Sequence, residues 1–181
     1  MKNKSADNAV KREVSIVLSG EAGQGIQSIE TILIKIIKQS GYNVFATKEY
    51  MSRVRGGVNA TMLRVSQDRA ASPVDKTDIF IPLEKEALAR YAYRLDKNTI
   101  IAGDASVLQD SRVNDIAFGK IAEALGNPLF SSMVAAGAAC GMIGIGKETA
   151  DGLIKNLFGK KGEETVNGNI KAFAAGYEAG E

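Results

Sequence analysis

The stretch LSGEAGQGIQS, residues 18–28, places three glycines between an apolar segment and a long segment of helical periodicity. The residues over 13–19, EVSIVLS, are apolar and rich in β-branched side chains, as in a buried strand. Over 24–39 the apolar side chains recur every three or four positions, which predicts an amphipathic helix that ends at Gly41. A further strand over 42–47 completes a Rossmann-like strand–glycine loop–helix start, typical of a layered α/β fold.

The rest of the chain alternates between the same two patterns. Apolar runs predict further strands over 58–66, 78–83 and 98–104. Helical periodicity predicts helices over 84–95, 114–125, 128–145, 147–160 and 162–180. We therefore predict one three-layer α/β domain over 13–181, with a mainly parallel, mixed sheet flanked by helices. The polar residues 1–12 are expected to form a disordered or extended tail.

Composition excludes several classes of site. The chain has 181 residues, one cysteine (Cys140) and no histidine. One thiol cannot hold a four-thiolate iron–sulfur cluster, and the lack of histidine removes Ser–His and Cys–His nucleophile pairs. A net charge of +2 does not favour a nucleic-acid partner, and the apolar run over 133–145 is too short to cross a bilayer. We expect a cytoplasmic protein without nucleic-acid or membrane partners.

The glycine loop is the first candidate site. A helix N-terminus presents N–H groups without helical partners, and glycine lets an anion approach the backbone closely. The candidate cofactor-binding residues here are Gly20, Gly23, Gln24, Gly25 and Ile26. The spacing G-x-x-G-x-G differs from the dinucleotide pattern G-x-G-x-x-G, and Glu21 would repel a phosphate if it pointed inward. A tight turn without a ligand therefore stays an open alternative.

The loop EYMSRVRGG, residues 49–57, is the second candidate, with Arg55, Gly56 and Gly57 as cofactor-binding residues. A guanidinium offers a planar fork to phosphate or carboxylate, and two glycines let the chain pass close to a partner. The alternative is an exposed basic turn. Loops at the carboxyl ends of neighbouring parallel strands converge on one edge of the sheet, where ligands bind. We therefore expect the two loops to lie close together.

Four blocks together indicate a family. They are GEAGQGI, EYMSRVRGGVNATMLRVS, GNPLFSSMVAAGAACGMIGI and a closing N-x-x-A-F-x-x-G-Y over 169–177. In this order they resemble the gamma subunit, or gamma domain, of 2-oxoacid:ferredoxin oxidoreductases, over roughly residues 13–178. Ala22 departs from the family loop, which usually has glycine there. The VRGG block looks closer to gamma domains that are fused in front of an alpha subunit.

The resemblance implies a role in an assembled enzyme. Such complexes oxidatively decarboxylate a 2-oxoacid on thiamine diphosphate, reduce ferredoxin through iron–sulfur clusters and transfer the acyl group to coenzyme A. It implies alpha, beta and ferredoxin-like delta subunits as partners, with thiamine diphosphate, magnesium and the clusters held by those partners. The gamma part is expected to help close the site and contact coenzyme A, with no catalytic or metal-binding residue of its own. We expect the isolated chain to be inactive.

Two other functions remain open at this point. A Rossmann-type nucleotide-binding oxidoreductase would need an acidic residue at the end of the second strand to hold a ribose. Glu49 lies nearby but follows Thr47 and Lys48, which is a poor match. The second function is that of a purely structural module of the same complex, in which the glycines serve only packing.

Overall fold

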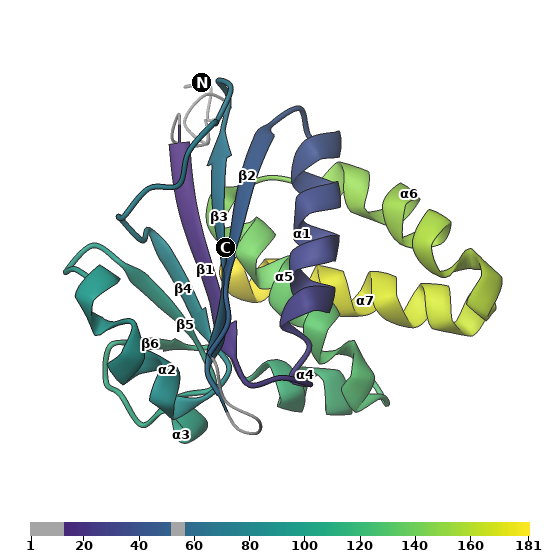
Figure 1. Cartoon of the computed structure of the whole chain (residues 1–181). Helices are drawn as coiled ribbons and strands as arrows, with labels where there is room; N and C mark the ends of the chain where they lie inside the picture. The colour runs from purple at the N-terminus through teal and green to yellow at the C-terminus, as the bar shows by residue number, and fades with distance from the viewer. Residues whose placement is uncertain (1–12, 52–56) are drawn as a thin grey trace, which may run out of the picture.

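A six-stranded mixed sheet with helices on both faces forms the body of the protein (Figure 1). The computed structural model describes residues 13–51 and 57–181. The strands are β1 (Glu13–Gly20), β2 (Asn43–Glu49), β3 (Asn59–Ser66), β4 (Ile79–Pro82), β5 (Ile100–Gly103) and β6 (Val113–Asp115). Their order across the sheet is β2-β3-β1-β4-β5-β6. The prediction for residues 1–12 lies outside the described residues.

The sheet is parallel from β1 through β4 and β5 to β6, whereas β3 runs antiparallel to both of its neighbours. The strand–loop–helix–strand start is present, but β3 is inserted between β1 and β2. In the resulting register Gly20 lies opposite Asn59, and Glu49 lies opposite Ala60. The end of β1, the end of β2 and the start of β3 therefore meet at one edge of the sheet.

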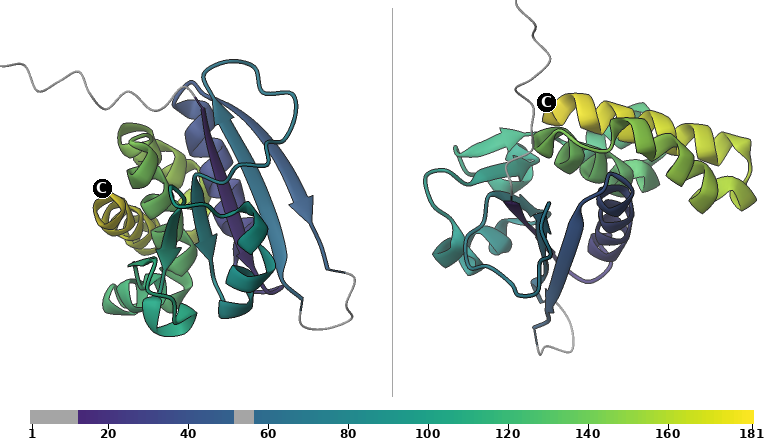
Figure 2. Two further views of the ribbon diagram at one scale, coloured as in Figure 1. Left: turned by 90° about the vertical axis from the view of Figure 1, so that its left-hand side faces the viewer. Right: turned by 90° about the horizontal axis from the view of Figure 1, so that it is seen from above.

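The helices divide between the two faces of the sheet (Figure 2). The larger core lies under α1 (Ile26–Gln39), α4 (Phe118–Ala124), α5 (Ser131–Ile143), α6 (Lys147–Phe158) and α7 (Glu163–Gly180). The smaller core lies under α2 (Lys85–Arg90) and α3 (Ala105–Leu108), with the short helix η1 (Ala92–Arg94) beside them. Two more short helices are η2 (Pro128–Phe130) and η3 (Gly159–Lys161). The three-layer prediction is confirmed.

Small residues bring α5 and α7 into backbone contact. A Cβ atom on Gly137 would collide with the Phe173 carbonyl oxygen, and one on Gly176 would collide with the Val134 carbonyl oxygen. This close approach explains why α5 is rich in alanine and glycine along its whole length. It also places Cys140 in a fully buried position, where burial raises the pKa of its thiol. The thiol therefore packs as a small apolar side chain.

Three predicted helices differ in the structure. The segment 114–125 begins with the edge strand β6, and only Phe118–Ala124 is helical. The segment 84–95 is divided at Tyr91, because α2 ends at Arg90 and η1 follows. The segment from Pro128 likewise starts as the short helix η2 before α5 begins. β6 is short and polar, so periodicity does not distinguish it from the helix that follows.

Within residues 13–51 and 57–181, no helix combines the length and apolar character that crossing a membrane requires.

Asp78 joins β1 to the start of β4, and we expect it to make stability depend on pH. Its carboxylate accepts hydrogen bonds from the Ser15 N–H at 3.0 Å and the Ser15 hydroxyl at 3.2 Å, and pairs with Lys76 at 2.7 Å. Burial alone would raise the pKa of Asp78, but Lys76 and Ser15 outweigh it and hold that pKa below 3.8. Because the pKa of Asp78 is depressed in the folded state, its carboxylate stabilises the fold at pH values above the ordinary pKa of an aspartate. This stabilisation is lost as the pH falls through the folded-state pKa.

The test is Asp78→Asn, followed by urea unfolding at several pH values. The variant should lose about 1.5 kcal/mol of unfolding free energy at neutral pH, the lower end for a hydrogen bond to a charged group. The difference in unfolding free energy between variant and parent should shrink as the pH falls below about 4. Asp78 of the parent then becomes protonated, first in the unfolded and then in the folded state. A difference that stays constant down to the acid transition would contradict this role.

Candidate functional site

The loop between β1 and α1 has a backbone shape that requires glycine at two positions. Gly23 has a φ of 97° and Gly25 a φ of 89°, both in the left-handed region that other residues rarely adopt. Gly25 is also the residue that precedes the first turn of α1, and a Cβ atom there would collide with the Ser132 Oγ of α5. The loop is therefore fixed by its own conformation and by α5.

Gln24 closes this loop from inside. Its side-chain Oε1 accepts a hydrogen bond from the Glu21 N–H at 2.7 Å, and its own N–H donates to the Glu21 carbonyl at 3.2 Å. Gly20, the last residue of β1, lies so close to Gln24 that a Cβ atom would collide with the same Oε1. Gly20 and Gln24 thus shape the turn, and neither lines the cavity beside it.

That cavity has a volume of about 430 Å³ and lies between the glycine loop, the first turn of α1 and the start of β3. It is lined by Glu21, Ala22, Gly23, Gly25, Ile26, Gln27, Ser28, Tyr50, Asn59, Ala60 and Thr61. Of the candidate residues, Gly23, Gly25 and Ile26 therefore share one cavity, whereas Gly57 does not line it. Arg55 and Gly56 lie outside the described residues. The volume is within the range of small-molecule sites.

The first turn of α1 offers hydrogen-bond donors to this cavity. No side chain caps the helix at Gly25, and no acidic residue lies in its first turn. The N–H groups of Ile26, Gln27 and Ser28 have no partner within the helix, and these three residues line the cavity. Such donors, together with the positive end of the helix dipole, favour a phosphate or a carboxylate.

Carboxylates lie at the same edge of the sheet and limit where an anion can bind. Glu21 lines the cavity, and Glu84 follows β4 at the neighbouring position of the edge. Burial raises the pKa of Glu84, and the charges of Glu21 and Glu86 raise it further. The N–H donors of α1 are therefore better suited to a phosphate than the acidic side of the cavity is.

A buried charge lies next to the cavity. Glu30 is only 7% exposed, although it belongs to the otherwise apolar stripe of α1. Its Oε2 accepts a hydrogen bond from the Thr61 hydroxyl at 3.1 Å and pairs with the Lys48 Nζ at 3.0 Å. The hydrogen bond to Glu30 raises the pKa of Lys48. Lys48 and Thr61 are direct neighbours across β2 and β3, so the pair ties α1 to the cavity wall.

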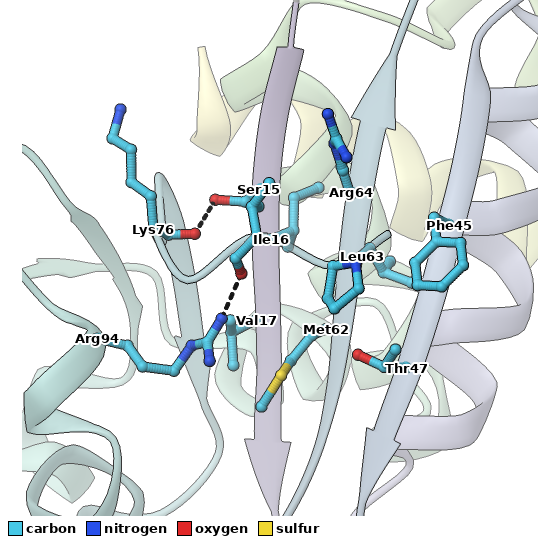
Figure 3. Close-up of a pocket in the computed structure, with 12 residues that line it drawn as sticks. Ser15, Ile16, Val17, Phe45, Thr47, Met62, Leu63, Arg64, Lys76 and Arg94 are labelled. Atoms are coloured by element: carbon cyan, nitrogen blue, oxygen red, sulfur yellow. Dashed lines mark hydrogen bonds between the residues drawn. The ribbon is translucent and has the colours of Figure 1, made fainter. Parts of the chain in front are cut away.

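Two other hollows are weaker candidates. Figure 3 shows one between the 73–76 segment and the outer face of β1, β2 and β3. There the Lys76 carbonyl accepts a hydrogen bond from the Ser15 hydroxyl, and the Arg94 guanidinium donates one to the Val74 carbonyl. Its volume is about 10 Å³, which is room for one water molecule at most. The other is a groove of about 660 Å³ between the end of α4 and the start of α7. Neither is lined by a residue that the sequence analysis predicts to bind a cofactor.

On the part of the chain that the structure describes, no three histidine, cysteine, aspartate or glutamate side chains gather as a metal-binding group.

Sequence reasoning missed several residues of the cavity. Tyr50 lies within the second candidate loop, residues 49–57, and could have been noticed there as an aromatic residue among charges. Asn59 and Thr61 belong to an ordinary alternating strand, so nothing in the sequence marks them. They line the cavity because β3 is placed next to β1, with Asn59 opposite Gly20.

Comparison with known proteins identifies relatives over almost the whole chain. The family model described as pyruvate ferredoxin/flavodoxin oxidoreductase matches residues 15–179. The 2-oxoglutarate synthase subunit KorC of Archaeoglobus fulgidus is 31% identical over 171 residues, which span 93% of this chain and 89% of KorC.

Solved structures show the same fold. The 2-oxoglutarate:ferredoxin oxidoreductase from Magnetococcus marinus, solved with 2-oxoglutarate, coenzyme A and succinyl-CoA bound, has a TM-score of 0.82 at 24% identity. The match covers 94% of this chain but only 31% of that one. The gamma subunit of a keto/oxoacid ferredoxin oxidoreductase from Geobacter sulfurreducens has a TM-score of 0.73 at 23% identity, over 92% of this chain and 98% of that subunit.

Proposed function

The chain belongs to the pyruvate ferredoxin/flavodoxin oxidoreductase family, and we propose that it works as the gamma subunit or gamma domain of a 2-oxoacid:ferredoxin oxidoreductase complex. The match over residues 15–179 is the observation that carries this proposal. Two likenesses support it: KorC, which this chain spans almost completely, and the fold shared with the Geobacter gamma subunit. The complex would convert a 2-oxoacid to acyl-CoA and CO2 and reduce ferredoxin.

Within such a complex, we propose that the 430 Å³ cavity binds part of coenzyme A. The first-turn N–H groups of α1 are suited to one of the phosphates of this cofactor, and Gly23 and Gly25 leave the backbone open to it. Positioned backbone donors bind an anion without a rearrangement of the protein, which favours a productive orientation of the bound coenzyme A.

The redox chemistry is proposed to take place on partner subunits. Thiamine diphosphate with magnesium would supply a carbanion-stabilising group, and iron–sulfur clusters would carry the electrons. Alpha and beta subunits, a ferredoxin-like delta subunit and ferredoxin itself are the expected partners. The contribution of this chain is then to bind and orient coenzyme A.

Co-purification from the native source tests the assembly. The chain should co-elute in size-exclusion chromatography with subunits that carry thiamine diphosphate and iron–sulfur clusters, identified by mass spectrometry and by cofactor analysis. Elution of the chain without such partners, under conditions that keep known complexes of this family intact, would contradict the proposal.

Arg55 remains a sequence-based prediction and has a test of its own. If its guanidinium meets an anionic group of coenzyme A, Arg55→Ala should raise the KM for coenzyme A in the assembled complex by about tenfold, the loss of one charged hydrogen bond. Arg69→Ala, in an exposed turn, is the control and should leave KM unchanged. An unchanged KM for Arg55→Ala, with assembly intact, would favour the alternative of a purely structural module.

A further inference from the structure

Tyr50 presents an exposed aromatic ring at the cavity. The residue is 63% exposed and lines the cavity together with the glycine loop and the start of β3. An exposed ring in a soluble protein needs no explanation when it stands alone. A ring at the wall of a 430 Å³ cavity, next to a set of free N–H donors, is a different case.

The backbone on both sides of Tyr50 is held in place. On one side the Glu49 carboxylate accepts a hydrogen bond from the Arg90 guanidinium at 3.0 Å, and Glu49 is still part of β2. On the other side the Met51 N–H donates to the Asn59 side-chain oxygen at 3.1 Å. Asn59 itself lines the cavity. The ring is thus carried by an ordered segment, so that little conformational entropy is lost when a ligand binds to it.

We propose that Tyr50 is the platform on which the adenine ring of coenzyme A stacks, so that this chain binds the nucleotide end of the cofactor. The inference rests on the proposed function, because it assigns an orientation to the cofactor in that cavity. A purine is a flat π-system that stacks on tyrosine, whereas the pantetheine arm contains no ring. With the adenine on Tyr50 and a phosphate on α1, the thiol end extends out of the cavity. The acyl group would then be received at the partner subunits.

The test compares two acyl acceptors in the assembled complex. Coenzyme A and 4′-phosphopantetheine carry the same thiol arm, but only coenzyme A has the adenine nucleotide. Tyr50→Ala should raise the KM for coenzyme A by about tenfold, the effect of losing one base stacked on an aromatic ring, and should leave the KM for 4′-phosphopantetheine within about twofold. Tyr50→Phe keeps the ring and should behave like the parent with both acceptors.

Tyr93→Ala is the matched control, since Tyr93 is 72% exposed in η1 and does not line the cavity. It should change neither KM. If Tyr50→Ala leaves the KM for coenzyme A unchanged, or raises the KM of both acceptors equally, the stacking role is wrong while the proposed function stands. If the partner subunits form acyl-CoA equally well when this chain is left out, the proposed function fails and the inference fails with it.

Discussion

Replacing Gly176 by alanine is expected to lower the free energy of unfolding by about 3 kcal/mol, at the upper end of what over-packing costs. The new Cβ atom would collide with the Val134 carbonyl oxygen and lie 2.9 Å from the Val134 Cα. These neighbours are backbone atoms of α5, so they cannot move by a change of side-chain rotamer. The two helices must separate, and the buried contacts along α5 and α7 are weakened together. Because domains of this kind have a total stability of about 5–15 kcal/mol, this is a large share.

Denaturant unfolding, followed by circular dichroism, measures this loss. Gly152→Ala is the control, because Gly152 lies on the exposed side of α6 and a Cβ atom there meets nothing within 4 Å. That variant should gain about 0.5–1 kcal/mol, the usual difference between alanine and glycine inside a helix. Equal stability of Gly176→Ala and the parent would mean that α5 and α7 are farther apart than described.

Gly25→Ala is the second variant with a large expected effect, and here the effect concerns function as well. The left-handed φ of 89° becomes unfavourable for alanine by about 1–2 kcal/mol. The Cβ atom would also displace the Ser132 side chain and shift the loop that carries the donors of the cavity. We expect the KM for coenzyme A in the assembled complex to rise about tenfold, as for the loss of one hydrogen bond to a charged group.

Gly41→Ala is the control that distinguishes backbone strain from an effect on coenzyme A binding. Gly41 follows α1 at its other end with a φ of 88°, and a Cβ atom there meets nothing within 4 Å. The control should lose a similar amount of unfolding free energy, yet leave the KM for coenzyme A as in the parent. If both variants change KM equally, the glycine loop acts only through the stability of the fold.

Much of the fold could be predicted from local patterns. The stripe of isoleucines and leucines in α1 and the β-branched run in β1 produce elements close to their expected bounds. The small residues of α5 are visible in the sequence, and they allow the close approach of α7. The family resemblance was confirmed over residues 15–179. These features depend on periodicity and on residue size, which are properties of short segments of sequence.

Features that depend on distant contacts could not be predicted in the same way. The insertion of β3 between β1 and β2 results from strand pairing, and it alone brings Asn59 and Thr61 to the cavity. Glu30 interrupts an apolar stripe, and its partners Thr61 and Lys48 become evident only when two strands lie under α1. Gln24, expected to contact a cofactor, closes the turn, because its side-chain Oε1 accepts a hydrogen bond from the Glu21 N–H. Its cofactor-binding role stays a prediction. The cofactor-binding roles of Gly23, Gly25 and Ile26 stay predictions.

Reconstitution of the complex with and without this chain tests the account most directly. The rate of acyl-CoA formation would be measured with a 2-oxoacid, ferredoxin and increasing coenzyme A. We predict no turnover by this chain alone, little coenzyme A-dependent turnover by the partner subunits alone, and full, saturable turnover when the chain is added. Partner subunits that reach the same rate and the same KM for coenzyme A without this chain would contradict the account, as would oxidation of a 2-oxoacid by the isolated chain.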